Sequence, residues 1–237
     1  MVRMRPAERL RSRRALSRGQ AAAEYLVMLP VLLLLLLGTV QFGLVFVAKT
    51  ALDLAAFDGA RSGALSHGSA TTIRDGIARG LLPLYDKGLP ETPSLTYADT
   101  LEDQVYVRRV IVDNPLTVNI RVLNPTAADF QNFGTTINYL ATNGSAGTWS
   151  NAIPNARLLY NTASAGNVTI QDANVLRIRV RYCYPLIVPF VNTIIDKLME
   201  TDPGSAWNFQ CYESGGIALV ADGTALMQSP AIQSDLP

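Results

Sequence analysis

The chain has 237 residues, of which 49% are apolar and only 16% charged, whereas about 25% of the residues in a typical globular domain are charged. This length accommodates one folded domain plus an apolar segment and excludes a large multidomain enzyme. The formal net charge of +1 does not indicate a polycation that binds nucleic acid. Two cysteines and one histidine exclude a Cys₄ or Cys₂His₂ zinc site within one chain, and also a framework of several disulfides.

The charge is unevenly distributed along the chain. The first 18 residues hold seven arginines and one glutamate, a net charge of +6, which leaves −5 for the other 219 residues. Such an arginine-rich start can be a nucleic-acid-binding arm or the basic flank of a membrane segment. The second interpretation is favoured because an uncharged run follows almost at once, so no nucleic acid is expected among the partners.

The uncharged run covers residues 25–48, a length of 24 residues. As a helix it would be about 36 Å long, enough to cross a bilayer core of about 30 Å with some tilt. Because the apolar region of a secretory signal peptide is shorter, about 7–15 residues, we expect a retained single-pass anchor. The arginines before the run place the N-terminus in the cytoplasm by the positive-inside rule. The domain after the run would then be periplasmic, and the anchor would lie in the inner membrane, if the source is a Gram-negative bacterium.

A carboxylate stands at the edge of this run. Glu24 directly precedes Tyr25, the first residue of the uncharged stretch. A charge at the bilayer centre costs about 2.5–3.5 kcal/mol, and less near the interface. Two interpretations stay open on these residues alone: Glu24 lies in the headgroup layer, or it has a functional partner in the membrane.

The residues around Glu24 resemble a known processing signal. Gly19 ends the basic segment, four residues follow, and Glu24-Tyr25 then precede the apolar run. This arrangement resembles the type IVb prepilin signal in its Tad (Flp) form. The resemblance implies that a membrane prepilin peptidase cleaves after Gly19 and leaves Gln20 as the N-terminus, whose ammonium group Glu24 of a neighbouring subunit would neutralise. An uncleaved anchor, in which Gly19 only interrupts the helix, is the alternative.

Further short motifs follow in and after the apolar run: Leu29-Pro30, Phe42-Gly43, Ala55-Ala56 and Gly59-Ala60-Arg61. Together with a strand pattern near the C-terminus, they resemble TadE-like pseudopilins of the Tad (Flp) type IVb pilus family. TadF-like proteins share the leader and TadG-like relatives are longer, so the C-terminal strand pattern, alternating alanines that lead into Met227, favours the TadE-like assignment. The resemblance implies as partners a prepilin peptidase, other pilins or pseudopilins (TadF-like, Flp-type major pilin), the inner-membrane Tad assembly platform and membrane lipid.

Small residues continue the helical period after the apolar run and predict that the helix reaches about Ser66. This stripe either docks on the chain's own sheet or packs against neighbouring subunits in a filament, and Lys49 and Asp53 are spaced to pair on another face. His67 to Ser69 predict a break, with His67 as a solvated surface residue, before a second amphipathic helix from Ile73 to Leu84. The members of the stripe are Ala48, Ala51, Ala55, Gly59 and Gly63.

The second half of the chain carries strand signals. Alternating valines predict strands at 105–112 and 118–122, joined by a turn as an antiparallel hairpin. A loop is expected at 86–100, an irregular exposed insertion at 124–174, and a Pro-marked helix at 185–199. The clearest strand is 176–182, with a last strand from Ile217. On the strand at 176–182 a row of cations either binds an acidic partner or forms a solvated face that discourages edge pairing; the row consists of Arg177, Arg179 and Arg181.

The two cysteines flank the predicted helix at 185–199. On the translocated side of a membrane a bridge between Cys183 and Cys211 is chemically allowed, and for this spacing it would stabilise the fold by at most about 3.6 kcal/mol. Two independent thiols, one of them buried, are the alternative.

The chain contains no phosphate-binding glycine loop, no dinucleotide fingerprint, no His-Glu-x-x-His and no Gly-x-Ser-x-Gly. We therefore expect no catalytic residue, no metal and no cofactor. The predicted fold is α+β and pilin-like: a basic leader (1–19), a long N-terminal helix (20–66) and a periplasmic domain with a small antiparallel sheet (67–237). The expected function is that of a minor pilin-like subunit of the Tad pilus or secretion machinery, which can enter an extracellular pilus. An uncleaved anchor with a periplasmic binding domain is the alternative, and an anchored periplasmic hydrolase is a third class.

Overall fold

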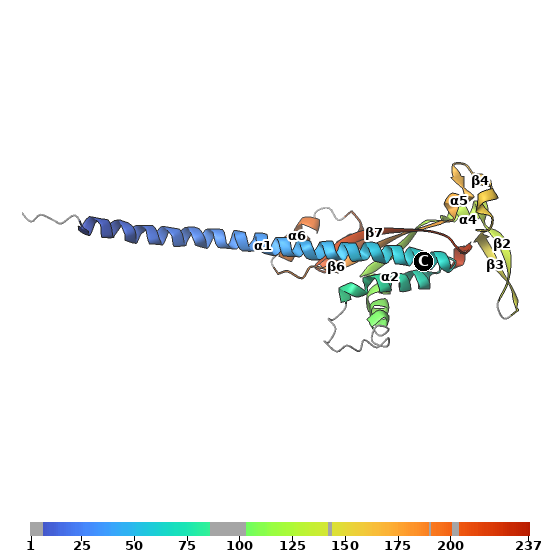
Figure 1. The fold of residues 1–237 in the computed structure, drawn as a ribbon, viewed down its shortest axis with the longest axis horizontal. Helices are drawn as coiled ribbons and strands as arrows, with labels where there is room; N and C mark the ends of the chain where they lie inside the picture. The colour runs from blue at the N-terminus through green and yellow to red at the C-terminus, as the bar shows by residue number, and fades with distance from the viewer. Residues whose placement is uncertain (1–6, 86–102, 142–143, 190, 201–203) are drawn as a thin grey trace, which may run out of the picture.

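A long helix projects from a small domain of antiparallel sheets and short helices (Figure 1). The structure is a computed structural model that describes residues 7–85, 103–141, 144–189, 191–200 and 204–237, with the backbone alone at residues 7–23, 196 and 200. The predicted α+β class is confirmed. The loop expected at 86–100 lies outside the described residues.

The helices and strands follow one another in a mixed order. The helical elements are α1 (Ala7–Leu65), α2 (Ala70–Tyr85), η1 (Val107–Val112), α4 (Ala127–Phe133), η2 (Leu158–Tyr160), α5 (Ile170–Ala173), α6 (Val191–Glu200), α7 (Ala206–Glu213) and η3 (Gln233–Asp235). The strands are β1 (Val118–Asn124), β2 (Thr135–Leu140), β3 (Ala146–Ile153), β4 (Ser164–Ala165), β5 (Val168–Thr169), β6 (Val175–Pro185), β7 (Gly216–Leu226) and β8 (Ala231–Ile232).

The main sheet has the antiparallel order β1-β6-β7 and packs one face against α1. Its central strand β6 alternates as the sequence predicts, with buried residues on the face toward α1. A Cβ at Gly223 of β7 would collide with the carbonyl group of Ala56, so glycine there allows α1 to lie close to the sheet. The buried residues of β6 on this face are Leu176, Ile178, Val180 and Tyr182.

Helix α2 packs along α1 at close range because glycines of α2 face the backbone of α1. A Cβ at Gly80 would lie 2.7 Å from the Cβ of Ala55, and one at Gly76 would lie 2.6 Å from the carbonyl oxygen of Asp58. Such small-residue contacts let two helix backbones approach closely. The pair α1–α2 and the sheet together bury the hydrophobic core of the domain.

The C-terminal end of α1 is capped by the end of the chain. The carbonyl oxygen of Ala64 accepts hydrogen bonds from the backbone N–H groups of Gln228 (3.0 Å) and Ser229 (3.2 Å), and thereby gains the partners that the last helical turn lacks. The helix ends at Leu65, as predicted to within one residue. His67 follows with a positive φ of 59°.

The prediction that His67 is a solvated surface residue is wrong. Its backbone N–H donates to Ser229 Oγ (2.7 Å), its Nδ1 lies 3.0 Å from the carbonyl oxygen of Pro230, and its ring lies 4.4 Å from that of Trp149. The residue is therefore partly buried between α1, the C-terminal segment and β3. The turn-like composition around it gave no sign of these partners, because they lie far away in the sequence.

The strand predicted at 105–112 is also wrong, because residues 103–106 are helical and η1 follows as a π-helix. The valines keep no single two-residue parity across Arg108–Arg109, and the buried pair Val107 and Val112 is spaced by one turn of a π-helix instead. Strand β1 therefore pairs with β6 and forms no hairpin with the preceding segment. The turn chemistry itself is confirmed, since the side chain of Asn114 accepts from the backbone N–H of Leu116.

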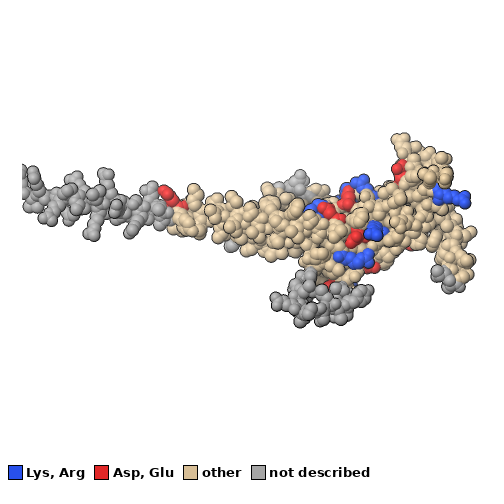
Figure 2. Space-filling model, in the orientation of Figure 1, with Lys and Arg blue, Asp and Glu red and all other residues tan. Residues whose placement is uncertain are grey.

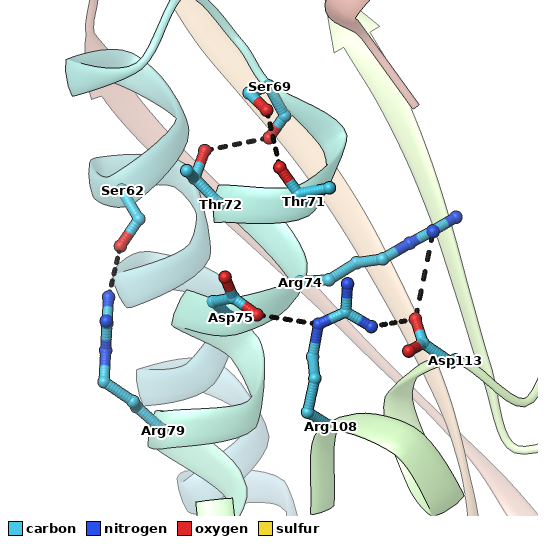
Figure 3. Close-up of polar contacts among 9 residues, drawn as sticks. All are labelled: Ser62, Ser69, Thr71, Thr72, Arg74, Asp75, Arg79, Arg108 and Asp113. Carbon is cyan, nitrogen blue, oxygen red and sulfur yellow. Dashed lines mark hydrogen bonds and ion pairs between the residues drawn. The ribbon is translucent and has the colours of Figure 1, made fainter. Parts of the chain in front are cut away.

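Ion pairs fix η1 against α2 (Figure 3). Arg108 Nε donates to Asp75 Oδ1 of α2 at 2.8 Å, and the same guanidinium also bonds Asp113 at the end of η1. Arg74 lies at 3.9 Å from Asp113 and extends the cluster. Because the Arg108 side chain is largely buried, its charge requires these carboxylate partners.

The insertion expected at 124–174 is more ordered than predicted. It contains α4, the β2–β3 hairpin, the β4–β5 hairpin and α5, and β8 extends the β2–β3 pair to a second sheet. Helices α4 and α5 both begin with a capping box, Thr126 with Asp129 and Thr169 with Asp172. The polar composition of this segment therefore reflects caps and exposed strand faces.

Candidate assembly surface on helix α1

The first part of the described helix α1 stands away from the folded domain (Figure 1). Every side chain from Glu24 to Leu36 is exposed, and the first fully buried one is Gln41. Figure 2 shows an uncharged surface along this projecting part, between an acidic group at its start and the charged domain. The stretch Glu24–Leu65 is long and apolar enough to cross a membrane. Pro30 lies inside this stretch, and membrane-spanning helices tolerate proline at such positions.

The small-residue stripe of α1 is used within the chain. A Cβ at Gly59 would lie 2.7 Å from a side-chain carbon of Ile77, and one at Gly63 would lie 2.5 Å from a side-chain carbon of Ile73. Ala48 and Ala55 are fully buried. Of the two interpretations left open by the sequence, docking on the chain's own α2 and sheet is the one the structure shows for these residues.

The opposite side of α1 keeps large apolar side chains in contact with solvent. Phe46 is 69% exposed, Val47 55%, Leu54 53% and Phe57 50%, and at 100° per residue these positions fall within an arc of about 100°. We call these four residues the outer stripe. The ion pair of Lys49 and Asp53, predicted from their spacing, flanks it on the same helix. The outer stripe extends the apolar surface of the projecting part alongside the folded domain.

The residues of the predicted processing signal lie on the projecting part. The backbone of Gly19 and Gln20 is helical and continuous with the rest of α1, and the side chains of Glu24 and Tyr25 are exposed. The peptide bond after Gly19 therefore lies about 33 Å along the helix from Gln41, where the folded domain begins. This distance leaves a membrane enzyme access to the bond without contact with the domain.

Cys183 of β6 and Cys211 of α7 are joined by a disulfide, with a Cα–Cα distance of 5.6 Å. The bridge ties α7 to the end of the main sheet. A Cβ at Gly216 would lie 2.6 Å from the sulfur of Cys183, so the glycine leaves the space that the bridge occupies. Trp207 Nε1 donates to the carbonyl oxygen of Pro115 at 2.8 Å and fixes the same helix near the turn before β1.

The predicted arginine row lies on the face of the main sheet opposite α1. Its strand β6 is the central one, so the interpretation that the row discourages edge pairing is wrong. Arg179 Nε donates to Asp222 Oδ1 of β7 at 2.7 Å and Arg177 donates to Asp222 Oδ2 at 3.1 Å. These hydrogen bonds lower the pKa of Asp222 to about 2, so part of the row is neutralised within the sheet.

Among the described residues, no group of three or more His, Cys, Asp or Glu side chains is placed to hold a metal ion. One polar residue in the apolar run was not singled out by the sequence. Gln41 is fully buried, and its Oε1 accepts a hydrogen bond from the backbone N–H of Val188 at 2.9 Å. An amide inside a membrane-length apolar run is the signal that could have marked it.

Comparison with protein families gives a match of residues 19–61 to the model of the TadE-like protein family. The N-terminal segment is TadE-like. The matched range begins at Gly19 and includes Glu24, the apolar run and the outer stripe, and it confirms the N-terminal part of the resemblance found in the sequence. The strand pattern that leads into Met227 lies outside the matched range. The match associates the chain with the Tad pilus system. Comparisons with curated proteins and with solved structures found no match.

Proposed function

We propose that this protein is a minor pilin-like subunit of the Tad pilus or secretion machinery, processed after Gly19 and assembled through α1. Before assembly α1 spans the inner membrane, with the basic leader in the cytoplasm and the folded domain in the periplasm. A prepilin peptidase, Flp-type and TadF-like subunits and the inner-membrane assembly platform are its partners. The subunit has a structural role and catalyses no reaction.

The outer stripe is the observation that supports this function best. A helix that only anchored a soluble domain would need apolar exposure over the bilayer alone, yet Leu54 and Phe57 are half-exposed beyond Lys49 and Asp53, outside the apolar run. Exposed apolar side chains that continue a membrane-length helix favour lateral packing with other helices. Extraction from the membrane into a fibre would bury the projecting part and the outer stripe together.

Processing is tested by N-terminal sequencing of the protein purified from a host with the matching peptidase. The wild-type chain is expected to begin at Gln20, and Gly19→Arg is expected to keep its leader while it still inserts, because a bulky side chain would block close approach to the scissile bond. Ser17→Arg adds the same charge two positions earlier and should be processed normally. A Gly19→Arg chain that begins at Gln20 would exclude this cleavage site.

Assembly is tested at Glu24. If its carboxylate neutralises the ammonium group of Gln20 in a neighbouring subunit, Glu24→Gln should insert into the membrane at wild-type levels but enter isolated pili at least about tenfold less, since an unpaired buried charge costs several kcal/mol. Tyr25→Phe changes the adjacent residue without altering charge and serves as the matched control. Equal incorporation of Glu24→Gln and wild type would contradict the pairing.

The uncleaved anchor with a periplasmic binding domain differs from this proposal in two measurements. It would retain Met1 or its neighbours as N-terminus and would be absent from purified pili. A chain found only in the membrane fraction with its leader intact would support that alternative, whatever the folded domain binds.

A further inference from the structure

One loop and one helix of the folded domain lie beside the part of α1 that belongs to the apolar run. After β6 the chain turns back along α1, and the backbone N–H of Val188 donates to Gln41 Oε1 at 2.9 Å. Helix α6 follows and contacts α1, as Figure 1 shows at the base of the projecting part. We call residues 186–189 together with α6 the docking segment.

The hydrogen bond fixes the depth of the docking segment relative to the run. Gln41 lies seven residues before Ala48, the last residue of the uncharged run, so it is about 10 Å below the end of that run. The run is about 36 Å long against a hydrocarbon core of about 30 Å. If the run is centred on the core, about 3 Å of it extends past each boundary, and Val188 therefore lies about 7 Å inside the outer hydrocarbon boundary when α1 spans a bilayer. A backbone N–H at this level needs a partner within the protein, and Gln41 provides it.

The docking segment exposes apolar side chains, as a contact with lipid at this depth requires. Ile187 in the loop is 65% exposed and Ile194 in α6 is 52% exposed, although both are strongly apolar. In α6 the apolar positions Val191, Ile194, Ile195 and Leu198 share one face, whereas Thr193 and Lys197 lie on the other. Val191 is buried against the domain and Ile194 continues the same face outward. Amphipathic helices of membrane interfaces bury an apolar face of this kind about 5–10 Å deep.

We propose that the docking segment is a second membrane contact, in which α6 lies in the interface of the leaflet on the side of the folded domain. The occupant of its apolar face is lipid. The inference rests on the proposed membrane span of α1 and adds that the domain sits on the bilayer in one orientation, with α6 down and the second sheet away from the surface. Detachment of α6 then becomes part of the cost of extracting the subunit into a fibre.

The test places one fluorescent label at a time on the full-length chain in phosphatidylcholine–phosphatidylglycerol vesicles that carry brominated acyl chains. The native disulfide occupies both cysteines, so an added cysteine is labelled alone. Ile187→Cys and Ile194→Cys report the proposed contact, Thr193→Cys and Lys197→Cys report the polar face of the same helix, and Leu33→Cys reports the span. Labels at 187 and 194 should be quenched by bromine about threefold more than those at 193 and 197, given the depth of an interfacial helix.

The outcomes separate the two proposals. Quenching at 33 with equal, weak quenching at 187, 193, 194 and 197 would overturn the docking segment and leave the span of α1 intact. A label at 33 that bromine does not quench would overturn the span itself, and the inference with it. Labels at 187 and 194 that are shielded from aqueous iodide but not quenched by bromine would show a protein occupant, such as a second copy, and would also overturn the lipid contact.

Discussion

Gln41 and Val188 are joined by a hydrogen bond across 147 positions of the sequence. Both residues are buried, and the bond connects the apolar run of α1 with the loop that leads to α6. A side-chain amide in such a run is costly unless it has a partner, and so is a backbone N–H at the same level. The Oε1 of Gln41 and the N–H of Val188 thus satisfy each other, whereas Nε2 of Gln41 is buried and has no hydrogen-bond partner among the described residues. The pair sets where the folded domain begins along the helix.

Gln41→Leu should loosen this junction. The Val188 N–H would lose its acceptor, which costs about 1–3 kcal/mol for a buried group, and the amides of residues 186–188 should exchange hydrogen at least about tenfold faster. Hydrogen exchange followed by mass spectrometry in detergent micelles measures this. Thr39→Val removes a polar side chain whose bond is local, to the carbonyl of Leu36, and should leave the loop unchanged. Equal protection in both variants would show that the bond is dispensable.

Gly80→Ala should destabilise the protein although alanine is the better helix former by about 1 kcal/mol. The added Cβ would lie 2.7 Å from the Cβ and 2.8 Å from the nitrogen of Ala55, so α2 would have to move away from α1, at a net cost of about 1–3 kcal/mol. Thermal unfolding followed by circular dichroism should show a lower midpoint. Gly38→Ala is the control, since its Cβ would meet nothing within 4 Å; similar midpoints for the two variants would contradict the close packing.

The sequence predicts well those elements that bury one face against a single neighbouring layer, because such burial gives a regular apolar pattern. The long helix α1, the alternation of β6 and strand β7 all follow from burial on a single face. Helix η1 escapes prediction because the valines at 105–112 form two short alternating pairs that resemble strand signals. The contacts of Arg108 with Asp75 and Asp113, which accompany the helix, cannot be read from the local pattern. The β2–β3 hairpin escapes because neither strand carries a continuous apolar face.

In the candidate site, too, the features with a local sequence signal could be predicted and those that depend on the fold could not. The spacing of Gly19 and Glu24 is a local feature and is visible in the sequence, whereas the outer stripe depends on which side of α1 the domain covers. Gln41 could be noticed as a polar residue in an apolar run, but its partner could not be named, because Val188 is far away in the chain. Contacts across such separations depend on the whole fold rather than on a local pattern.

Acid should remove a small part of the stability through Asp222. The guanidinium groups of Arg179 and Arg177 lower the pKa of Asp222 to about 2, below the value near 3.9 of an unfolded aspartate. The ionised carboxylate therefore stabilises the fold above pH 4, and this contribution is lost as the pH falls from about 4 to 2.

The side chain of Asp222 is 28% exposed and that of Arg177 is 50% exposed, so solvent screening limits the effect to at most about 1 kcal/mol. Thermal unfolding at a series of pH values should show that Asp222→Asn loses this acid-dependent part. Asp235→Asn removes a carboxylate from the η3 turn and should retain it. An unchanged pH profile in Asp222→Asn would contradict the assignment.

High pH should lower the free energy of unfolding through the ionisation of Tyr85 and Tyr182. Their hydroxyl oxygens lie 2.5 Å apart, and burial raises the pKa of both phenols above its usual value near 10. Because the unfolded chain ionises first, stability is full below pH 10 and falls above it. Ultraviolet titration should show a group of tyrosines that ionise only with unfolding, Tyr85 and Tyr182 among them. Tyr85→Phe should reduce the size of that group by one, whereas Tyr160→Phe, at an exposed position, should not.

Reduction of the disulfide should weaken the end of the main sheet that α7 covers. The bridge between Cys183 and Cys211 closes a loop with a sequence separation of 28, and its removal is expected to cost up to about 3.6 kcal/mol by the loop-entropy relation. Cys183→Ser with Cys211→Ser should therefore unfold at a lower temperature than wild type, and reduction should lower the wild-type midpoint to that of the double variant.

The mass of the oxidised wild type should rise by two hydrogens on reduction, and the double variant should show no such change. Gly216→Ala is a further variant, because its Cβ would lie 2.6 Å from the sulfur of Cys183 and 3.1 Å from that of Cys211. It should lower the midpoint of the oxidised protein more than that of the double variant, since the two substitutions act on the same contact and are not additive. An equal loss in both backgrounds would show that Gly216 is required for the β6–β7 pairing alone.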